Sequence, residues 1–304
     1  MSGAPHMRVG FIGLGAMGRH MAANLHKAGL LTAVFNRSFD KAQAFAKESG
    51  CLAVPALAEL ARHCDALVLC VSADADVREV ISAVAPTLPR GTLVIDCSTI
   101  GASTAREVAG QLAAKGIDFL DCPVSGGVEG ARDATLAIMV GGDGAAFERA
   151  LPILHALGKT VTHLGPSGAG QATKATNQIM CAGVIQAVAE AMAFARAEGL
   201  PLDKLIDTLS KGAGSSWYFV NRAPNVVRGS FPAGFRVRLH EKDLKICREM
   251  AAARGVQLPV IEMTLLHYRR LIEQGFGEED ISSLYRLKAA LFDEAKAAGR
   301  SAAG

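Results

Sequence analysis

The stretch Gly13-Leu14-Gly15-Ala16-Met17-Gly18 decides the fold of this chain. It follows a short apolar run at residues 8–12 and opens a segment, residues 17–27, whose apolar positions recur at helical spacing. A GxGxxG between a strand and a helix is typical of dinucleotide binding: its glycines permit a tight turn, let a pyrophosphate approach the backbone, and let helix and strand pack closely. We therefore expect this loop to bind a dinucleotide, and the alternative is a glycine turn without a ligand.

The pattern of an apolar run, a turn and a helical segment repeats through the first half of the chain. Such alternation is typical of right-handed βαβ crossovers and of a mainly parallel sheet covered on both faces. After residues 165–168 the strand signals disappear and helical signals continue to the end. We predict an α/β fold: an N-terminal Rossmann-type, doubly wound, mainly parallel sheet, then an all-α C-terminal domain built around a long interdomain helix. The expected strands are residues 8–12, 32–35, 66–71, 92–95, 117–120, 135–140 and 160–164.

We place the NAD(P)-binding domain at residues 7–166 and an all-α domain for substrate binding and oligomerisation at residues 167–304. The long helix should cover residues 169–198, stop at Gly199, and be buried on several sides because it is apolar nearly all round. A helix of this length also favours a second subunit, so we expect a homodimer or homotetramer. Gln186 and Glu190 interrupt its most apolar stretch, which makes it a poor membrane span. Further helices are expected at residues 202–210, 217–227, 241–253, 259–274 and 281–298.

The composition excludes several classes of function. The 304 residues include 32 Lys and Arg against 29 Asp and Glu, a net charge of +3 without a basic block, which argues against a nucleic-acid partner. Half of the residues are hydrophobic and a fifth are charged, as in a globular protein.

Cysteine and histidine usage indicates the compartment. The seven cysteines form no CxxC pair, and the eight histidines form no HExxH, so we expect a reducing cytoplasm and no metal site. We expect no secretory signal, since a basic segment before an apolar core is lacking. Residues 1–6 are expected to be a disordered lead-in, or a cloning remnant, before a start at Met7.

The cofactor type is indicated by Asn36, Arg37 and Ser38, about twenty residues beyond the glycines, where NAD-binding chains use an acidic side chain on the ribose. Arg37 can pair with a 2'-phosphate through charge-assisted bonds worth about 1.5 to 3 kcal/mol. We predict that NADPH is preferred over NADH, with NAD still possible. The alternative is that Arg37 is only a solvated charge.

Two later segments have the polar groups that a substrate needs. Asp121-Cys122-Pro123-Val124-Ser125-Gly126-Gly127 ends in a turn whose amides and hydroxyl can hold a carboxylate. Lys174 and Asn177 are three residues apart on the long helix and therefore share a face. A lysine among small residues on a buried helix needs a partner or a lowered pKa, which is the condition for a proton donor; the alternative is a lysine that reaches solvent.

At these residues the sequence resembles the β-hydroxyacid dehydrogenases. The resemblance extends from Met7 to about Lys288 through four motifs in matching order: residues 10–29, 121–127, 168–178 and the LHEKDL segment at 239–244. It implies hydride transfer from a reduced nicotinamide to the carbonyl carbon of a small aldehyde acid, with proton donation by the lysine.

The resemblance also implies roles for individual residues. Lys174 would be the catalytic lysine, Asn177 would hold the substrate, and Ser125, Gly126 and Gly127 would bind its carboxylate. Lys242 would contact the cofactor near the nicotinamide. The other positions that match cofactor-lining ones are Val71, Ser72, Asp76 and Thr99. Val71-Ser72 departs from the Leu-Pro that members often have, so the loop shape is less certain there.

Within the family, residues 232–236 resemble the members that reduce tartronate semialdehyde, so we expect a small carboxylate-bearing aldehyde or hydroxy acid as substrate. 3-Hydroxyisobutyrate, succinic semialdehyde and glyoxylate stay open as alternatives. An imine reductase has a similar architecture but usually lacks the lysine. A different class is a non-catalytic NADP-binding sensor, which an assay with NADPH and short aldehyde acids separates from an enzyme.

Overall fold

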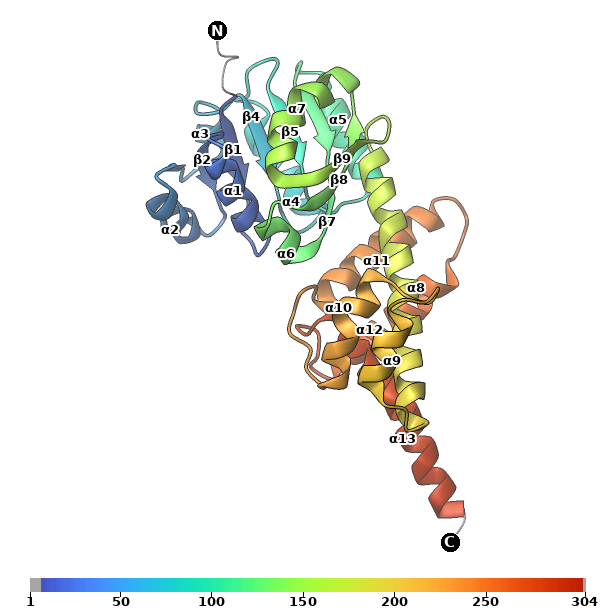
Figure 1. Ribbon diagram of the computed structural model, residues 1–304. Helices are drawn as coiled ribbons and strands as arrows, with labels where there is room; N and C mark the ends of the chain where they lie inside the picture. Colours follow the sequence, from blue (N-terminus) through green and yellow to red (C-terminus); the bar gives the residue numbers. More distant parts are fainter. Residues whose placement is uncertain (1–6, 303–304) are drawn as a thin grey trace. The chain divides into compact units, whose positions relative to one another are not determined.

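The computed structural model describes residues 7–302, and the expectation for residues 1–6 lies outside the described residues. The chain divides into two compact units, Met1–Lys174 and Ala175–Gly304. The described part of the first unit is a sheet with helices, and that of the second is helical (Figure 1). The predicted fold class, an α/β domain followed by an all-α domain, is thus confirmed.

The strands of the first unit follow the order β3-β2-β1-β4-β5-β6-β8-β7, with β9 beside β8. The pairs from β3 to β6 are parallel, β8 is antiparallel to β6 and β7, and β9 is parallel to β8. The strand order reverses between β1 and β4, which is where ligands bind in such sheets. The strands are β1 Val9–Ile12, β2 Leu31–Phe35, β3 Leu52–Ala53, β4 Ala66–Leu69, β5 Leu93–Asp96, β6 Asp118–Asp121, β7 Val124–Ser125, β8 Leu136–Gly142 and β9 Gly158–His163.

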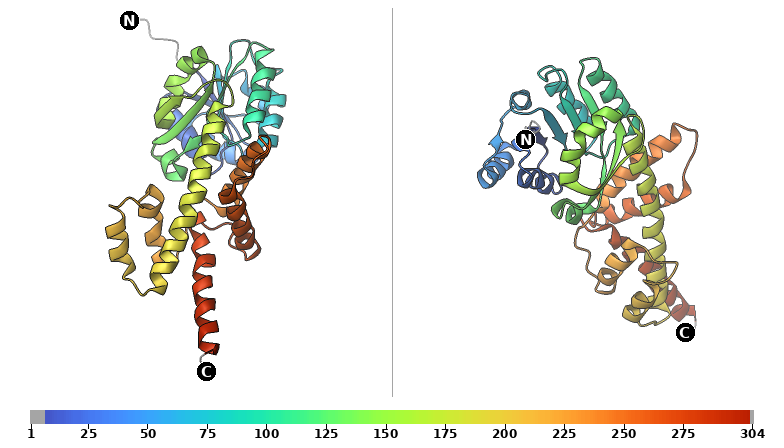
Figure 2. Two further views of the ribbon diagram at one scale, coloured as in Figure 1. Left: turned by 90° about the vertical axis from the view of Figure 1, so that its right-hand side faces the viewer. Right: turned by 45° about the horizontal axis from the view of Figure 1, so that its top comes forward.

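Helices cover both faces of this sheet (Figure 2). Alternate residues of one strand point to opposite faces, so Phe11 belongs to one apolar cluster and Ile12 to the other. Residues of α1, α2 and α7 complete the first cluster, and residues of α4 and α5 complete the second. The helices are α1 Gly18–Lys27, α2 Phe39–Ser49, α3 Leu57–Leu60, α4 Asp74–Val84, α5 Ala102–Ala113, α6 Gly127–Arg132 and α7 Gly144–Leu157.

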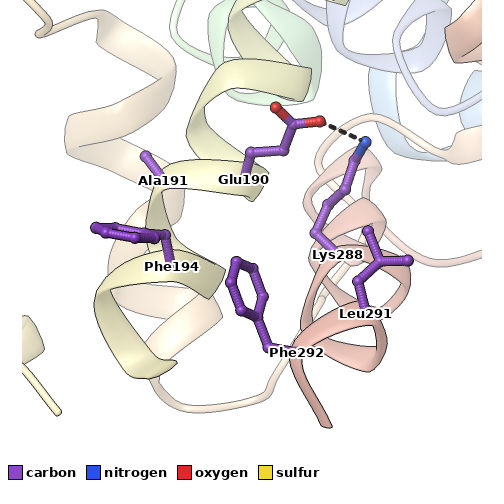
Figure 3. A pocket seen from close by; sticks show the side chains of 6 residues that line it. All are labelled: Glu190, Ala191, Phe194, Lys288, Leu291 and Phe292. Carbon is purple, nitrogen blue, oxygen red and sulfur yellow. Dashed lines mark hydrogen bonds and ion pairs between the residues drawn. The ribbon is translucent and has the colours of Figure 1, made fainter. Parts of the chain in front are cut away.

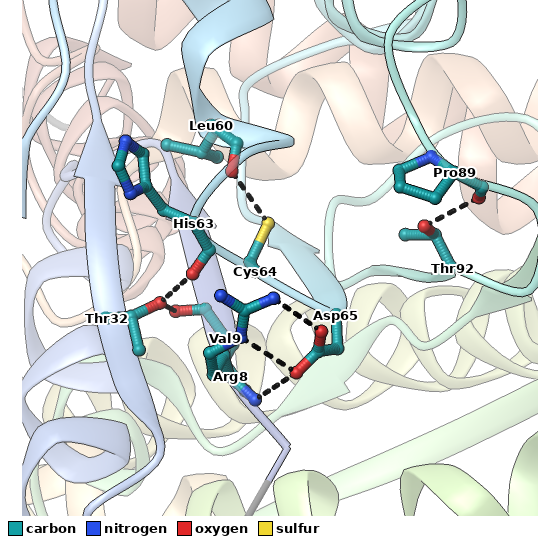
Figure 4. Close-up of polar contacts among 9 residues, drawn as sticks. All are labelled: Arg8, Val9, Thr32, Leu60, His63, Cys64, Asp65, Pro89 and Thr92. Atoms are coloured by element: carbon teal, nitrogen blue, oxygen red, sulfur yellow. Dashed lines mark hydrogen bonds and ion pairs between the residues drawn. The ribbon is translucent and has the colours of Figure 1, made fainter.

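The amino-terminal edge of the sheet is closed by polar contacts (Figure 4). Asp65 accepts hydrogen bonds from the backbone N–H of Arg8 at 3.0 Å and from its guanidinium at 2.8 and 3.2 Å. This guanidinium holds the pKa of the Asp65 carboxyl below its ordinary value. The Thr32 hydroxyl donates to the carbonyl of His63 at 2.6 Å. Polar side chains at this edge therefore tie the ends of β1, β2 and β4 together.

The second unit is built on α8 Ala169–Ala197, which continues into it from the first unit. In the second unit this helix contributes Ala182, Ile185 and Ala189 to one apolar cluster and Val188 and Met192 to another. Among the described residues, α8 is long and apolar enough to cross a membrane, with a mean hydropathy of 1.5, yet half of that window is buried inside the protein. The other helices are α9 Leu202–Leu209, α10 Trp217–Val227, α11 Val237–Ala252, α12 Pro259–Glu273, the short 3-10 helix Ile281–Leu284 and α13 Tyr285–Ala302.

Helix α11 begins at Val237, whereas the sequence pattern predicts a start at residue 241. The backbone N–H groups of Val237 and Arg238 bond the carbonyls of Glu279 at 3.0 Å and Gly277 at 3.1 Å. These tertiary partners satisfy first-turn donors, which sequence periodicity does not reveal. The LHEKDL segment therefore lies within the helix.

Candidate functional site

The glycine loop between β1 and α1 combines tight packing with one open position. Gly13 has a φ of +99°, and a Cβ there would collide with the carbonyl of Cys70, while a Cβ at Gly18 would overlap the carbonyl of Gly13. By contrast, no atom of the described residues other than those of its chain neighbours lies within 4 Å of the place where a Cβ of Gly15 would be. The absent side chain leaves room for a pyrophosphate to approach the start of α1, whose free N–H groups favour anions. The loop thus fits a dinucleotide.

The residues after β2 divide their contacts between the loop and solvent. The side-chain oxygen of Asn36 accepts the backbone N–H of Leu14 at 2.9 Å, and its amide donates to the carbonyl of Ser38 at 3.0 Å. Arg37 is 83% exposed, and its guanidinium lies 3.3 Å from the carboxylate of Asp76 in the first turn of α4. An exposed pair of this kind is weak, about 0 to 1 kcal/mol, so Arg37 stays available for an anionic ligand.

The loops after β4 and β5 meet at the same carboxyl-terminal edge. The Ser98 hydroxyl accepts the backbone N–H of Val71 at 2.9 Å. Asp74 accepts the backbone N–H of Gly101 at 2.9 Å. The structure thus brings the segment with Val71 and Ser72 next to the segment with Thr99, as expected for adjacent parallel strands.

The turn predicted to hold a carboxylate follows β6. Val124 and Ser125 form the short strand β7, which pairs with Ile138 and Ala137 of β8. Gly126 and Gly127 have φ values of +134° and +66°, a region that favours glycine. Sequence periodicity did not reveal β7, because two residues are too few for a pattern. The pairing with β8 fixes the direction in which this turn leaves the sheet.

The first turns of α8 lie against this edge. Asp121 accepts the backbone N–H groups of Gly168 at 2.7 Å and Gln171 at 2.9 Å. Lys174, one turn further along, is 7% exposed. The structure thus brings the start of the lysine helix next to the segment that leads to Ser125.

Two buried carboxyl groups lie side by side beneath these loops. Asp96 and Asp121 are register partners in β5 and β6, and both are fully buried. Asp96 accepts the backbone N–H of Ser98 at 2.9 Å through one oxygen, and its other oxygen has no hydrogen-bond partner among residues 7–302. Burial raises the pKa of Asp96 to about 7, and burial also raises the pKa of Asp121 although backbone N–H groups oppose it.

The thiol of Cys122, close to the Ser125–Gly127 turn, is made unreactive by its burial. Cys122 is fully buried, and burial raises its pKa well above the ordinary value, as it does for Cys97. A protonated, inaccessible thiol is a poor nucleophile.

The remaining predicted residues belong to the second unit, and Asp243 joins several of them. Asn177 follows Lys174 by three residues on α8 and donates to the side chain of Gln178 at 2.8 Å. Gln178 donates to Asp243 at 2.7 Å, and the ammonium of Lys242 lies 3.0 Å from the same carboxylate. Sequence reasoning missed Gln178 and Asp243 as site residues, although each directly follows a predicted one, Asn177 and Lys242, within the same motif.

A separate hollow of about 400 Å³ in the second unit contains no predicted site residue (Figure 3). An ion pair of 2.7 Å between Lys288 and Glu190 crosses it, and its other walls are apolar. Among the described residues, no group of three or more His, Cys, Asp or Glu side chains could hold a metal ion.

Two protein families match consecutive parts of the chain. Residues 8–165 match the family described as the NAD binding domain of 6-phosphogluconate dehydrogenase. Residues 168–288 match the family described as the NAD-binding domain of NADP-dependent 3-hydroxyisobutyrate dehydrogenase.

Full-length relatives extend the match. The NAD-dependent L-serine dehydrogenase of Pseudomonas aeruginosa is 34% identical, over 92% of this chain and 97% of its own. The 2-hydroxy-3-oxopropionate reductase of Escherichia coli is 36% identical, over 83% of this chain and 87% of its own. The solved structure of Mycobacterium tuberculosis 3-hydroxyisobutyrate dehydrogenase with L-serine has a TM-score of 0.86 and 32% identity, covering 92% of this chain and 98% of its own.

Proposed function

The chain belongs to the β-hydroxyacid dehydrogenase family, and on that premise we propose that it reduces a small aldehyde acid such as tartronate semialdehyde, with NADPH as preferred cofactor. It is an NAD(P)-dependent dehydrogenase, and its relatives are named for small hydroxy acids. One observation carries the proposal. The buried Lys174 follows directly after the helix turn that Asp121 holds against the segment of the carboxylate turn.

In this proposal each group of the chain has one task. When bound, the reduced nicotinamide supplies the hydride. Lys174 donates a proton to the carbonyl oxygen of the substrate, a contribution of about a hundredfold to ten-thousandfold. The amides of Gly126 and Gly127 and the hydroxyl of Ser125 hold the substrate carboxylate, and Asn177 holds the substrate beside the lysine.

For the cofactor, we assign the pyrophosphate to the Gly13–Gly18 loop and the adenosine ribose to Asn36, Arg37 and Ser38. Val71, Ser72, Asp76, Thr99 and Lys242 complete the proposed cofactor site. The preference for NADPH is supported by the exposed Arg37 and by the absence of an acidic side chain at position 36. Relatives and family descriptions mention both NAD and NADP, so Michaelis constants for the two cofactors decide the preference.

The experiment that tests the function is a panel assay followed by absorbance of the reduced cofactor. We expect NADPH oxidation with tartronate semialdehyde and weaker oxidation with succinic semialdehyde or glyoxylate. A second candidate is oxidation of a 3-hydroxy acid, because the solved relative contains L-serine and is named for 3-hydroxyisobutyrate. L-Serine and 3-hydroxyisobutyrate with NADP⁺ or NAD⁺ therefore belong in the panel. The proposal would be contradicted if none of the aldehyde acids caused oxidation of NADPH.

We also propose that the enzyme acts in the cytoplasm and that it forms a homodimer or homotetramer. We further propose that the cofactor domain ends near Pro166. The odd number of cysteines without a CxxC pair supports the compartment, and the long apolar helix α8 supports the assembly. One family match ends at residue 165 and the next begins at residue 168, which supports the domain boundary. Light scattering of the purified chain measures the number of subunits, and a monomer at all concentrations would contradict the proposed assembly.

A further inference from the structure

We infer that Asp121 and Gln171 are positioning residues, which fix the lysine helix turn against the substrate turn and the cofactor loop. The inference rests on the proposed function, because it gives these two side chains a task in the reaction assigned to Lys174. Both residues and all the partners described here belong to the first unit. Asp121 is fully buried and Gln171 is 1% exposed.

Asp121 connects the substrate turn to α8. Its two carboxylate oxygens accept separate N–H groups, from Gly168 at 2.7 Å and from Gln171 at 2.9 Å. Asp121 also begins the segment that reaches Ser125 four residues later, and the carbonyl of Pro123 accepts the N–H of Met139 at 3.1 Å, which holds that segment on β8. One side chain therefore sets the spacing between the proposed carboxylate site and the turn before Lys174.

Two glycines make this close approach possible. A Cβ at Gly170 would overlap the carbonyl oxygens of Asp121 and Met139. A Cβ at Gly141 would lie 2.7 Å from the backbone nitrogen of Gly170 and 2.6 Å from a carboxylate oxygen of Asp121. If the helix slid along the close contact between Gly170 and Gly141, Asp121 would lose its hydrogen-bond partners. This movement is unfavourable, because a buried carboxylate costs free energy unless it is hydrogen-bonded. The register of α8 at the site is thereby fixed.

Gln171 connects the same helix turn to the cofactor loop. Its amide nitrogen donates to the carbonyl of Ser98 at 2.8 Å, and its amide oxygen accepts the N–H of Ile100 at 3.2 Å. These two backbone groups flank Thr99, which is assigned to the cofactor. The Ser98 hydroxyl in turn accepts the N–H of Val71, so the contact extends to the next loop.

The two side chains should therefore affect different measured quantities. Asp121 sets the geometry between the substrate carboxylate and Lys174, which governs kcat. Gln171 sets the position of Thr99, which governs NADPH binding. A side chain that served stability alone would lower the melting temperature and the folded fraction, but it would change neither quantity per folded molecule.

The test compares Asp121→Asn and Gln171→Met with the control Asp143→Asn. Asp143 is matched to Asp121 because its carboxylate also accepts two helix N–H groups, from Ala145 at 2.9 Å and Ala146 at 3.0 Å. It is the exposed N-cap of α7, and neither Asp143 nor its partners Ala145 and Ala146 are assigned a task in the reaction. Asparagine at position 121 replaces one acceptor oxygen with a donor, and methionine at position 171 keeps the length of the side chain without its hydrogen bonds.

We expect Asp121→Asn to lower kcat about tenfold to a hundredfold per folded molecule, with the NADPH dissociation constant changed less than about twofold. We expect Gln171→Met to weaken NADPH binding about threefold to tenfold. Asp143→Asn should leave both quantities unchanged. The inference is overturned if both variants match the control, or if both change kcat and NADPH binding together in equal measure.

Two readouts need no substrate and separate this inference from the proposed function. NADPH fluorescence titration reports the effect of Gln171→Met, and hydrogen–deuterium exchange at residues 168–174 should be faster in Asp121→Asn, with α7 unchanged. If the wild-type protein reduces no aldehyde acid, the proposed function fails while these two results still support the positioning roles. If exchange and NADPH binding equal those of wild type, the positioning roles fail whatever the substrate. Gln171→Met decides alone if Asp121→Asn does not fold.

Discussion

Asp96 and Asp121 are register partners at the ends of neighbouring parallel strands, yet their carboxyl groups differ in hydrogen bonding. Both oxygens of Asp121 accept backbone N–H groups, whereas one oxygen of Asp96 has no hydrogen-bond partner in the described part of the chain. Two buried carboxyl groups this close disfavour simultaneous ionisation. The fold therefore favours a protonated, neutral Asp96 beside Asp121, whose carboxylate accepts the N–H groups at the start of the lysine helix.

This arrangement makes stability depend on pH. Burial raises the pKa of Asp96 from 3.8 to about 7, so the folded state binds a proton that the unfolded state loses. The stabilisation is full below the ordinary value and is lost as pH rises from about 4 to about 7, with an upper limit on the order of 4 kcal/mol. We expect Asp96→Asn, which is neutral at every pH, to lose less stability than wild type over this range.

Urea unfolding at several pH values from about 4 to 8 measures this difference. Asp40→Asn is the control, because Asp40 is exposed in the first turn of α2. Parallel curves of unfolding free energy against pH for wild type and Asp96→Asn would contradict the assignment.

The glycines of the loop predict opposite outcomes for two similar substitutions. Gly15→Ala adds a methyl group where no atom of the described residues other than those of its chain neighbours lies within 4 Å, so folding should be unaffected while the pyrophosphate loses its approach. Gly18→Ala places a methyl group against the carbonyl of Gly13, so the fold itself should be destabilised. Thermal unfolding with and without NADPH distinguishes them: Gly15→Ala should melt like wild type without cofactor and gain no stability from it. A normal gain in Gly15→Ala would refute the assignment of the loop.

Arg37 predicts the choice of cofactor. Arg37→Ala should raise the Michaelis constant for NADPH about tenfold or more, because a charge-assisted contact to the 2'-phosphate is lost, and leave that for NADH unchanged. Arg149→Ala is the matched control, since Arg149 is a half-exposed arginine of the same unit, on α7, whose guanidinium pairs with Asp118. Equal effects of Arg37→Ala on both cofactors would show that Arg37 does not read the phosphate.

Much of the fold was predictable because it depends on local patterns. The apolar and helical runs predict the positions of every strand of the first unit except the two-residue strands β3 and β7, and they predict the length of α8. Helix α10 is observed at the predicted residues 217–227. The start of α11 was not predicted, because it depends on carbonyls of Gly277 and Glu279. The site shows the same division: motif spacing identifies Lys174 and the glycine turn, whereas the contacts of Gln171 with residues flanking Thr99 span more than seventy positions.

The central claim is that Lys174 donates the proton to an aldehyde acid that NADPH reduces. The most direct measurement is the turnover of tartronate semialdehyde by wild type and Lys174→Ala, together with their NADPH dissociation constants. We predict that kcat falls about a hundredfold to ten-thousandfold while NADPH binding changes little. A variant that keeps full turnover, or that loses NADPH binding as much as turnover, would contradict the claim.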